Sequence, residues 1–120
     1  VCAGYDSTYA SHFESSAKAV CGKGVTIVPI LGNKRGNDST IQMKHYIKTL
    51  CEEYNIDYQV EFTKPSEGGG GTVSSFFATR GMECIDVAIP VLAMHSPMEC
   101  ISKKDIFWAY RLYKVFLESN

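Results

Sequence analysis

The fold is decided by residues 24–62, which read GVTIVPILGNKRGNDSTIQMKHYIKTLCEEYNIDYQVEF. The segment 24–31 is rich in β-branched residues and predicts a strand, although Pro29 interrupts its backbone hydrogen bonding. A helix is predicted over about residues 39–54, and the alternating pattern at 57–62 predicts a second strand. This strand–helix–strand order favours an α/β fold in which at least part of the sheet is parallel.

The helix expected at 39–54 has both a start signal and a face for the core. Ser39 and Gln42 have the spacing of a capping box, in which each side chain satisfies a free backbone N–H of the first turn. Apolar side chains recur at helical intervals, at Met43, Tyr46, Ile47, Leu50, Cys51 and Tyr54. We therefore expect this helix to cover one face of the sheet.

Further elements are expected on both sides of this unit. They are a helix at 7–21, a short helix at about 72–80, a strand at 83–89 that either continues past Pro90 or restarts at 91–94, and a helix at about 103–118. The segments 25–31, 58–62 and 83–89 should form one mixed sheet with helices on its faces. The predicted fold class is a three-layer α/β/α sandwich with a mixed sheet.

The last of these helices is unusual in its composition. Ser102 is in position to cap it, and Asp105 lies in its first turn, where a negative charge is favourable. Its apolar residues cover most of its circumference, so we expect it to be buried between layers or against a partner.

Length and charge limit the classes of function. The 120 residues suit one domain or a piece of one, with 45% hydrophobic and 21% charged residues. The net charge of −1 and the absence of a block of like charge argue against nucleic acid and anionic membranes as partners. The longest apolar run is far shorter than the ~20 residues of a membrane span. The chain begins at Val1 without a methionine, which suggests a processed, truncated or excised piece of a longer protein.

The five cysteines favour reduced thiols over a disulfide framework. Their number is odd, no two have CxxC spacing, and most lie in or beside apolar runs: Cys2, Cys21, Cys51, Cys84 and Cys100. This pattern is typical of small buried residues in a cytoplasmic protein.

His95 is the residue on which a functional interpretation depends. It stands in VLAMHSPMEC (91–100), where an apolar run ends and a Ser-Pro pair turns the chain. The carboxyl end of a strand is where α/β proteins place their sites, so His95 could be a ligand aimed into a cleft. It has no second ligand at a recognisable zinc spacing, however, and this local pattern favours a core histidine. His12 and His45 have polar neighbours on predicted helices and are interpreted as surface residues.

Two other features leave alternatives open. The run EGGGGTVSSFF (67–77) could direct backbone N–H groups towards an anion, or it could be a flexible link between a strand and a helix. Asp86 lies within an apolar strand, where a buried carboxylate would need a partner or a metal. We favour the simpler interpretation that it faces outwards on an alternating strand. The chain has no GxSxG, HExxH or CxxC motif.

A family resemblance enters through GGGGTVSSFFATRGMECIDVAIPVLAMHSPME, residues 68–99. This stretch resembles the C-terminal part of the aspartyl aminopeptidase / aminopeptidase I family of dinuclear zinc metallopeptidases, which carry a Gly-Gly-Thr stretch, a strand of the form (V/I)D(V/I)G(I/V)P and a Met-His-Ser turn followed by Glu. The segments 5–14 and 22–27 also look like family segments. Two residues depart from the pattern, since Ala88 replaces a usual glycine and Ser7 a usual proline.

The resemblance implies a role for particular residues. The histidine of the Met-His-Ser turn is a zinc ligand in the family and corresponds to His95. The backbone of Gly69, Gly70, Gly71 and Thr72 is expected to line the substrate cleft. The family's other metal ligands and its general base would lie outside this chain, so no catalytic residue is expected within it.

For the complete protein, the resemblance implies a cytoplasmic enzyme with two divalent metal ions, zinc in the family. It would remove N-terminal residues, acidic ones among them, from peptides by metal-activated water. Residues 1–120 would be a C-terminal segment of its catalytic domain, inactive in isolation, with the remainder of that domain as a partner and a homo-oligomer as the full assembly. Two alternatives remain: a related metal-dependent peptidase or deacylase of the same fold, and a non-catalytic interaction fragment.

Overall fold

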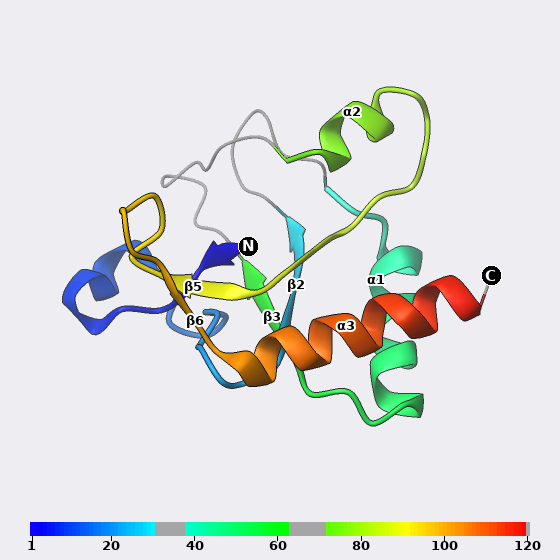
Figure 1. Ribbon diagram of the computed structural model, residues 1–120. Helices are drawn as coiled ribbons and strands as arrows, with labels where there is room; N and C mark the ends of the chain where they lie inside the picture. Colours follow the sequence, from blue (N-terminus) through cyan, green and yellow to red (C-terminus); the bar gives the residue numbers. More distant parts are fainter. Residues whose placement is uncertain (31–37, 63–71, 120) are drawn as a thin grey trace.

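The computed structural model describes residues 1–30, 38–62 and 72–119 (Figure 1). Its elements are β1 (Cys2–Ala3), the 3-10 helix η1 (Ser7–His12), β2 (Val25–Ile30), α1 (Ile41–Glu53), β3 (Tyr58–Phe62), α2 (Ser74–Ala78), β4 (Asp86–Ala88), β5 (Pro90–Leu92), β6 (Cys100–Ile101) and α3 (Lys103–Glu118). The predicted α/β class with mixed sheets is confirmed.

The central sheet has the strand order β3-β2-β4. Strands β2 and β3 are parallel, with Val25 opposite Tyr58, and β4 is antiparallel to β2, with Asp86 opposite Val28. The prediction that these three segments share one mixed sheet is therefore confirmed. The register between β2 and β3 shifts between Ile27 and Ile30. Pro29 lies within this shift and has no N–H to donate, so the regular ladder cannot continue through it.

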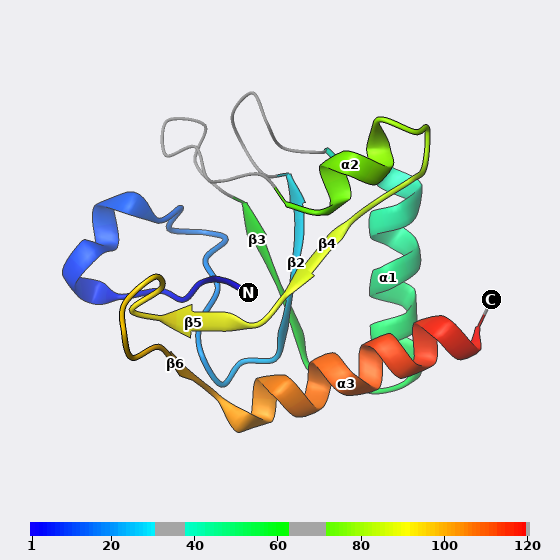
Figure 2. The same cartoon turned by 45° about the horizontal axis from the view of Figure 1, so that its top comes forward.

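A second sheet, with the order β1-β5-β6, takes over where the first one ends. The chain leaves β4 at Ala88 and enters β5 at Pro90, so the apolar run is two short strands in different sheets and not one long strand. Strand β1 pairs in parallel with β5, and β6 pairs with it in an antiparallel direction. Figure 2 shows β5 directed away from α3 and continuing towards the turn that leads to β6.

The main core lies between the central sheet and the two long helices (Figure 2). Its buried residues come from β2, α1, α3 and the turn before β3: Val25, Ile27, Ile47, Leu50, Cys51, Ile56, Ala109, Leu112 and Val115. The apolar stripe predicted for residues 39–54 therefore faces the core as expected. The N-terminal cap of α1 differs from the predicted capping box, because Thr40 Oγ1 accepts from the Met43 N–H at 3.1 Å. Ser39 instead donates its N–H and its hydroxyl to the Pro29 carbonyl, at 2.9 and 3.0 Å.

The helix predicted at 7–21 is wrong for most of its length. Only Ser7–His12 is helical, as a 3-10 segment without a buried residue. Further along, Ala17 and Ala19 use their carbonyls to accept from Phe62 and Tyr5, at 3.2 and 2.6 Å. Backbone groups that pair with β3 and with the segment after β1 cannot also make helical hydrogen bonds.

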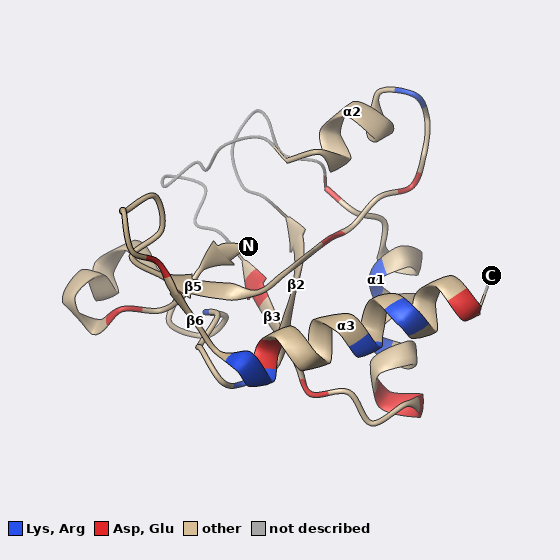
Figure 3. Ribbon diagram, in the orientation of Figure 1, with Lys and Arg blue, Asp and Glu red and all other residues tan. Residues whose placement is uncertain are grey.

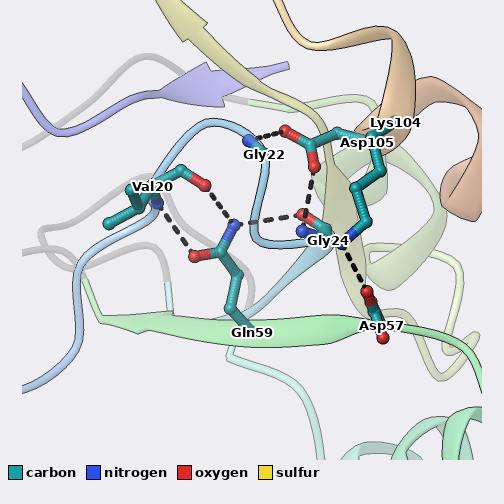
Figure 4. A network of polar contacts seen from close by, with 7 residues as sticks. All are labelled: Val20, Gly22, Gly24, Asp57, Gln59, Lys104 and Asp105. Carbon is teal, nitrogen blue, oxygen red and sulfur yellow. Dashed lines mark hydrogen bonds and ion pairs between the residues drawn. The ribbon is translucent and has the colours of Figure 1, made fainter.

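The loop before β2 is fixed by a buried carboxylate from the first turn of α3 (Figure 4). Asp105 is fully buried, and its two oxygens accept from the N–H groups of Gly22 at 2.7 Å and Gly24 at 2.9 Å. The Gln59 side chain completes the network, accepting from the Val20 N–H at 2.8 Å and donating to the Gly24 carbonyl at 3.0 Å. Asp105 is therefore a structural clamp in addition to a first-turn anion.

Helix α3 buries one side and exposes another. Ala109, Leu112 and Val115 face the core, so one side of this helix is buried as expected. The opposite side carries a stripe of exposed apolar residues: Ile106, Phe107, Tyr110, Tyr113 and Leu117. Figure 3 shows basic and acidic residues together along α3. In the described parts of the chain, none of the helices has the length and apolar character needed to cross a membrane.

Candidate active site

The carboxyl edge of the central sheet positions the candidate residues. Because β2 and β3 are parallel, both carboxyl ends lie at one edge, where α/β proteins commonly bind ligands. Asp86 begins β4 opposite Val28 and so lies at the same edge. Figure 2 shows α2 beside the ends of β2 and β4. The candidate substrate residues Gly69, Gly70 and Gly71 lie outside the described residues, whereas Thr72 is described and half-buried.

His95 lies in the turn between β5 and β6 and is exposed. Within this chain His95 is not part of the hydrophobic core. Its backbone N–H donates to Glu99 Oε1 at 2.6 Å, and the Ser96 N–H closes the turn onto the Ala93 carbonyl at 3.0 Å. The imidazole thus lies just beyond the carboxyl end of β5. The expectation that it faces the Gly68–Gly71 loop falls on residues outside those described.

The backbone of this turn is strained. His95 has φ = 68° and Ala93 has φ = 56°, in the left-handed region that side-chain-bearing residues rarely occupy. Such a conformation costs of order 1–2 kcal/mol per residue and persists only where the surroundings impose it. The hydrogen bond from His95 to Glu99 supplies part of that constraint, and strained residues of this kind are frequent at functional sites.

Asp86 joins two hydroxyl groups at the start of α2. Its Oδ2 lies 3.0 Å from Thr72 Oγ1 and 2.8 Å from Ser74 Oγ, and the two hydroxyl oxygens are also in contact. Asp86 lies on the side of β4 away from the core, since Ile85 and Val87 pack on the core, but it is half-buried there and has two hydroxyl partners that the sequence did not predict. The signal that could have revealed this was its position between apolar residues, which demanded such a partner.

A buried polar cluster on β1, β2 and β3 was not anticipated from the sequence. Glu61 is 8% exposed, and neither its Oε2 nor Thr26 Oγ1 has a hydrogen-bond partner among the described residues. Burial raises the pKa of Glu61, while a hydrogen bond from Cys2 acts in the opposite direction. Burial and the neighbouring Glu61 carboxylate raise the pKa of Cys2 to about 12. Cys2 is consequently a protonated thiol at neutral pH, which disfavours it as a nucleophile or metal ligand.

The donors of the described residues fit one ligand of a zinc site and not a complete one. A zinc site takes three or four protein ligands, usually His, Cys, Asp or Glu. Residues 1–30, 38–62 and 72–119 contain no group of three such side chains that could hold a metal ion. His45 is exposed on α1, and the His12 ring lies 6.2 Å from that of Tyr9 at the end of η1. The exposed imidazole of His95 can therefore serve as one donor of a shared set.

Beneath α2 lies a mainly apolar cavity of about 350 Å³. Helices α1, α2 and α3 and the approach to β4 contribute its walls: Met43, Ile47, Val73, Ser74, Phe77, Glu83, Cys84, Ile85, Asp86, Val87, Leu112, Tyr113 and Phe116. Asp86 and Ser74 thus belong both to the hydroxyl cluster and to the rim of this cavity.

Comparison with known proteins gives a consistent result. A probable M18 family aminopeptidase 1 of Borreliella burgdorferi (strain ZS7) is 37% identical over 120 residues, covering 97% of this chain and 26% of that protein. The crystal structure of an M18 aminopeptidase from Thermotoga maritima superimposes with a TM-score of 0.88 at 34% identity, over 96% of this chain and 26% of that one. Aminopeptidase I from Clostridium acetobutylicum gives a TM-score of 0.84 at 30% identity, over 96% and 26%.

The chain thus spans about a quarter of the length of the relatives it matches. The family model described as aminopeptidase I zinc metalloprotease (M18) matches residues 1–117, nearly the whole sequence. The segment that carries His95 and the segment that carries Thr72 both lie inside this match. This chain belongs to the M18 family of aminopeptidase I zinc metalloproteases.

Proposed function

We propose that residues 1–120 form a C-terminal segment of the catalytic domain of a zinc aminopeptidase, in which His95 is a metal ligand. One observation carries the proposal: an exposed imidazole stands on a strained turn at the carboxyl end of β5, within the region matched by a zinc metalloprotease family.

The proposed site is formed partly by residues of this chain and partly by residues outside it. His95 would supply one ligand of a centre with two divalent ions, and the remaining ligands and the general base would come from outside this chain. When bound, zinc activates water near neutral pH and polarises a carbonyl oxygen. Gly69, Gly70, Gly71 and Thr72 would line the cleft and hold the peptide. Within this chain the contribution is therefore to ligation and substrate binding.

The substrates proposed are peptides with a free N-terminus, and acidic N-terminal residues are the first to be tested. The experiment uses the full-length protein with peptides that differ in their first residue, each in a free and an N-acetylated form. An aminopeptidase releases the first residue of the free peptides, loses activity with a chelator and regains it with zinc. Cleavage confined to the acetylated forms would favour the deacylase alternative, and no hydrolysis of either form would contradict the proposal.

We also propose a cytoplasmic location and a homo-oligomeric assembly for the complete enzyme. All five cysteines are free, including the exposed Cys100, and unpaired thiols are typical of a reducing compartment. The exposed apolar stripe on α3, which includes Tyr110 at 62% exposure and Leu117 at 73%, supports a protein partner on that face.

A further inference from the structure

We propose that Asp86 is a positioning residue for substrate binding, which acts by holding Thr72 through a hydrogen bond between the Asp86 carboxylate and the Thr72 hydroxyl. This inference rests on the proposed function, in which Thr72 lines the substrate cleft. Thr72 precedes Val73, the N-cap residue of α2, and its hydroxyl lies 3.0 Å from Asp86 Oδ2. Asp86 itself need not touch the substrate.

Apart from the Asp86 contacts, few interactions hold α2 against the sheet. This helix has only five residues, Ser74–Ala78, and none of them is buried. Part of the space below it is the cavity of about 350 Å³. Among the described residues, the hydrogen bonds that tie 72–82 to a strand are those that Asp86 accepts. Within the part of the chain that the structure describes, the hydrogen-bonded attachment of 72–82 to the central sheet therefore depends on this one carboxylate.

Asp86 itself lies on β4, a strand that is fixed by the sheet and by α3. Asp86 is the first residue of β4 and lies opposite Val28 of β2, the middle strand of the central sheet. The next residue, Val87, accepts a hydrogen bond through its carbonyl from the Tyr113 hydroxyl of α3, at 3.0 Å. The sheet on one side and α3 on the other thus limit the movement of the carboxylate.

The hydrogen bond to Asp86 fixes the side chain of Thr72. A carboxylate is an acceptor, and hydrogen bonds to an ionised group are shorter and stronger than those between neutral groups. The Thr72 and Ser74 hydroxyls both donate to Asp86 Oδ2, so the one proton of the Thr72 hydroxyl is directed at the carboxylate. The hydroxyl is therefore not free to rotate towards solvent, and Thr72 is held in one orientation, with its carbonyl accepting from Ser75 Oγ at 2.7 Å.

The test is a double-mutant cycle in the full-length enzyme. Asp86→Ala, Thr72→Val and the double variant are compared for KM, kcat and bound zinc, with an N-terminal aminoacyl substrate. Asp86→Ala is expected to raise KM about tenfold, equivalent to about 1.4 kcal/mol, with a much smaller change in kcat and in zinc content. In the Thr72→Val background, Asp86→Ala should raise KM little further, because its effect passes through Thr72.

Asp57→Ala is the matched control. Asp57 also loses a polar contact on substitution, an ion pair with Lys104 at 2.8 Å, but it lies before β3, at the opposite end of the sheet. The KM of Asp57→Ala should stay at the wild-type value. If Asp86→Ala does not fold, Thr72→Ser and Thr72→Val give the same test, because serine retains the hydroxyl that Asp86 holds. The KM of Thr72→Ser should then lie nearer to wild type than that of Thr72→Val.

Three results would overturn the inference: an unchanged KM in Asp86→Ala, full additivity of the two substitutions, or equal KM values for Thr72→Ser and Thr72→Val. Each of these requires an active wild-type enzyme. An inactive wild-type enzyme would instead show that the proposed function itself is wrong, so the two failures are distinguished within one series of assays.

Discussion

At the scale of single residues, His95 holds a backbone conformation with φ = 68°, and the Glu99 carboxylate accepts from its N–H. Groups that orient a metal ligand without touching the metal typically contribute 10–100-fold in metal affinity. We therefore expect Glu99→Ala in the full-length enzyme to weaken zinc binding by roughly 10–100-fold, with little change in stability because Glu99 is exposed. Competition with a chelating dye measures this affinity.

Glu118→Ala is the control for that measurement, since Glu118 is an exposed glutamate at the end of α3, in a long contact with Lys114 at 3.9 Å. Zinc affinity that is equal in the Glu99→Ala, Glu118→Ala and wild-type proteins would show that Glu99 does not orient His95.

Glu61 provides a prediction on the dependence of stability on pH. Its pKa is raised by burial above the usual value of 4.5, so the folded state holds the proton more tightly than the unfolded state. The resulting stabilisation is complete below pH 4.5 and is lost as the pH rises through the raised pKa. Glu61→Gln removes this titration. The variant should be more stable than wild type at pH 8 and close to it at pH 4, because glutamine carries no charge to bury.

Urea unfolding of both proteins at the two pH values checks the Glu61 prediction. The difference in unfolding free energy between variant and wild type should grow with pH. A difference that is constant, or that is larger at pH 4, would mean that burial does not raise the pKa of Glu61.

At the scale of elements, the attachment of α3 to the loop before β2 depends on Asp105. Asp105→Ala would leave the Gly22 and Gly24 N–H groups without their acceptor in a region where Gly24 has φ = 107° and no room for a side chain. A hydrogen bond to a charged group contributes about 1.5–3 kcal/mol, so the variant should lose at least about 3 kcal/mol of unfolding free energy. Thermal or urea unfolding measures the loss, and a change below 1 kcal/mol would contradict the clamp.

The sequence predicts the elements that local patterns define and misses those that distant contacts define. The helices at 41–53 and 103–118 and the three strands of the central sheet follow from periodicity and flanking polar residues. The helix expected at 7–21 fails because Ala17 and Ala19 pair with chain that is distant or extended. Asp86 and Asp105 could be seen as carboxylates in apolar surroundings, but their partners could be identified only once the elements were placed.

At the scale of the whole molecule, this chain spans about a quarter of its M18 relatives. Its described residues bring together fewer than three potential metal ligands at any point, so we expect the 120-residue chain alone to bind zinc weakly and to hydrolyse no peptide. Equilibrium dialysis with zinc and an aminopeptidase assay on the isolated chain check this. Tight binding of zinc by this chain, or hydrolysis, would require a ligand set other than the one proposed.

The candidate metal ligand His95 was harder to predict from the sequence than the fold was. One histidine on a turn has no local partner in the sequence, and its neighbours favoured a core residue. The exposed turn places His95 outside the core of this chain, and the family model that matches this region is described as a zinc metalloprotease. Neither observation can be obtained from the spacing of His95 alone.

The most direct measurement is zinc content and aminopeptidase activity in full-length His95→Ala, beside wild type, His12→Ala and His45→Ala. Loss of a ligand disturbs both metal retention and the activation of water, so His95→Ala should lose activity by more than about 100-fold and bind less zinc. The two control variants should stay close to wild type in both quantities. Near-normal activity and zinc content in His95→Ala would contradict the assignment of His95 as a metal ligand.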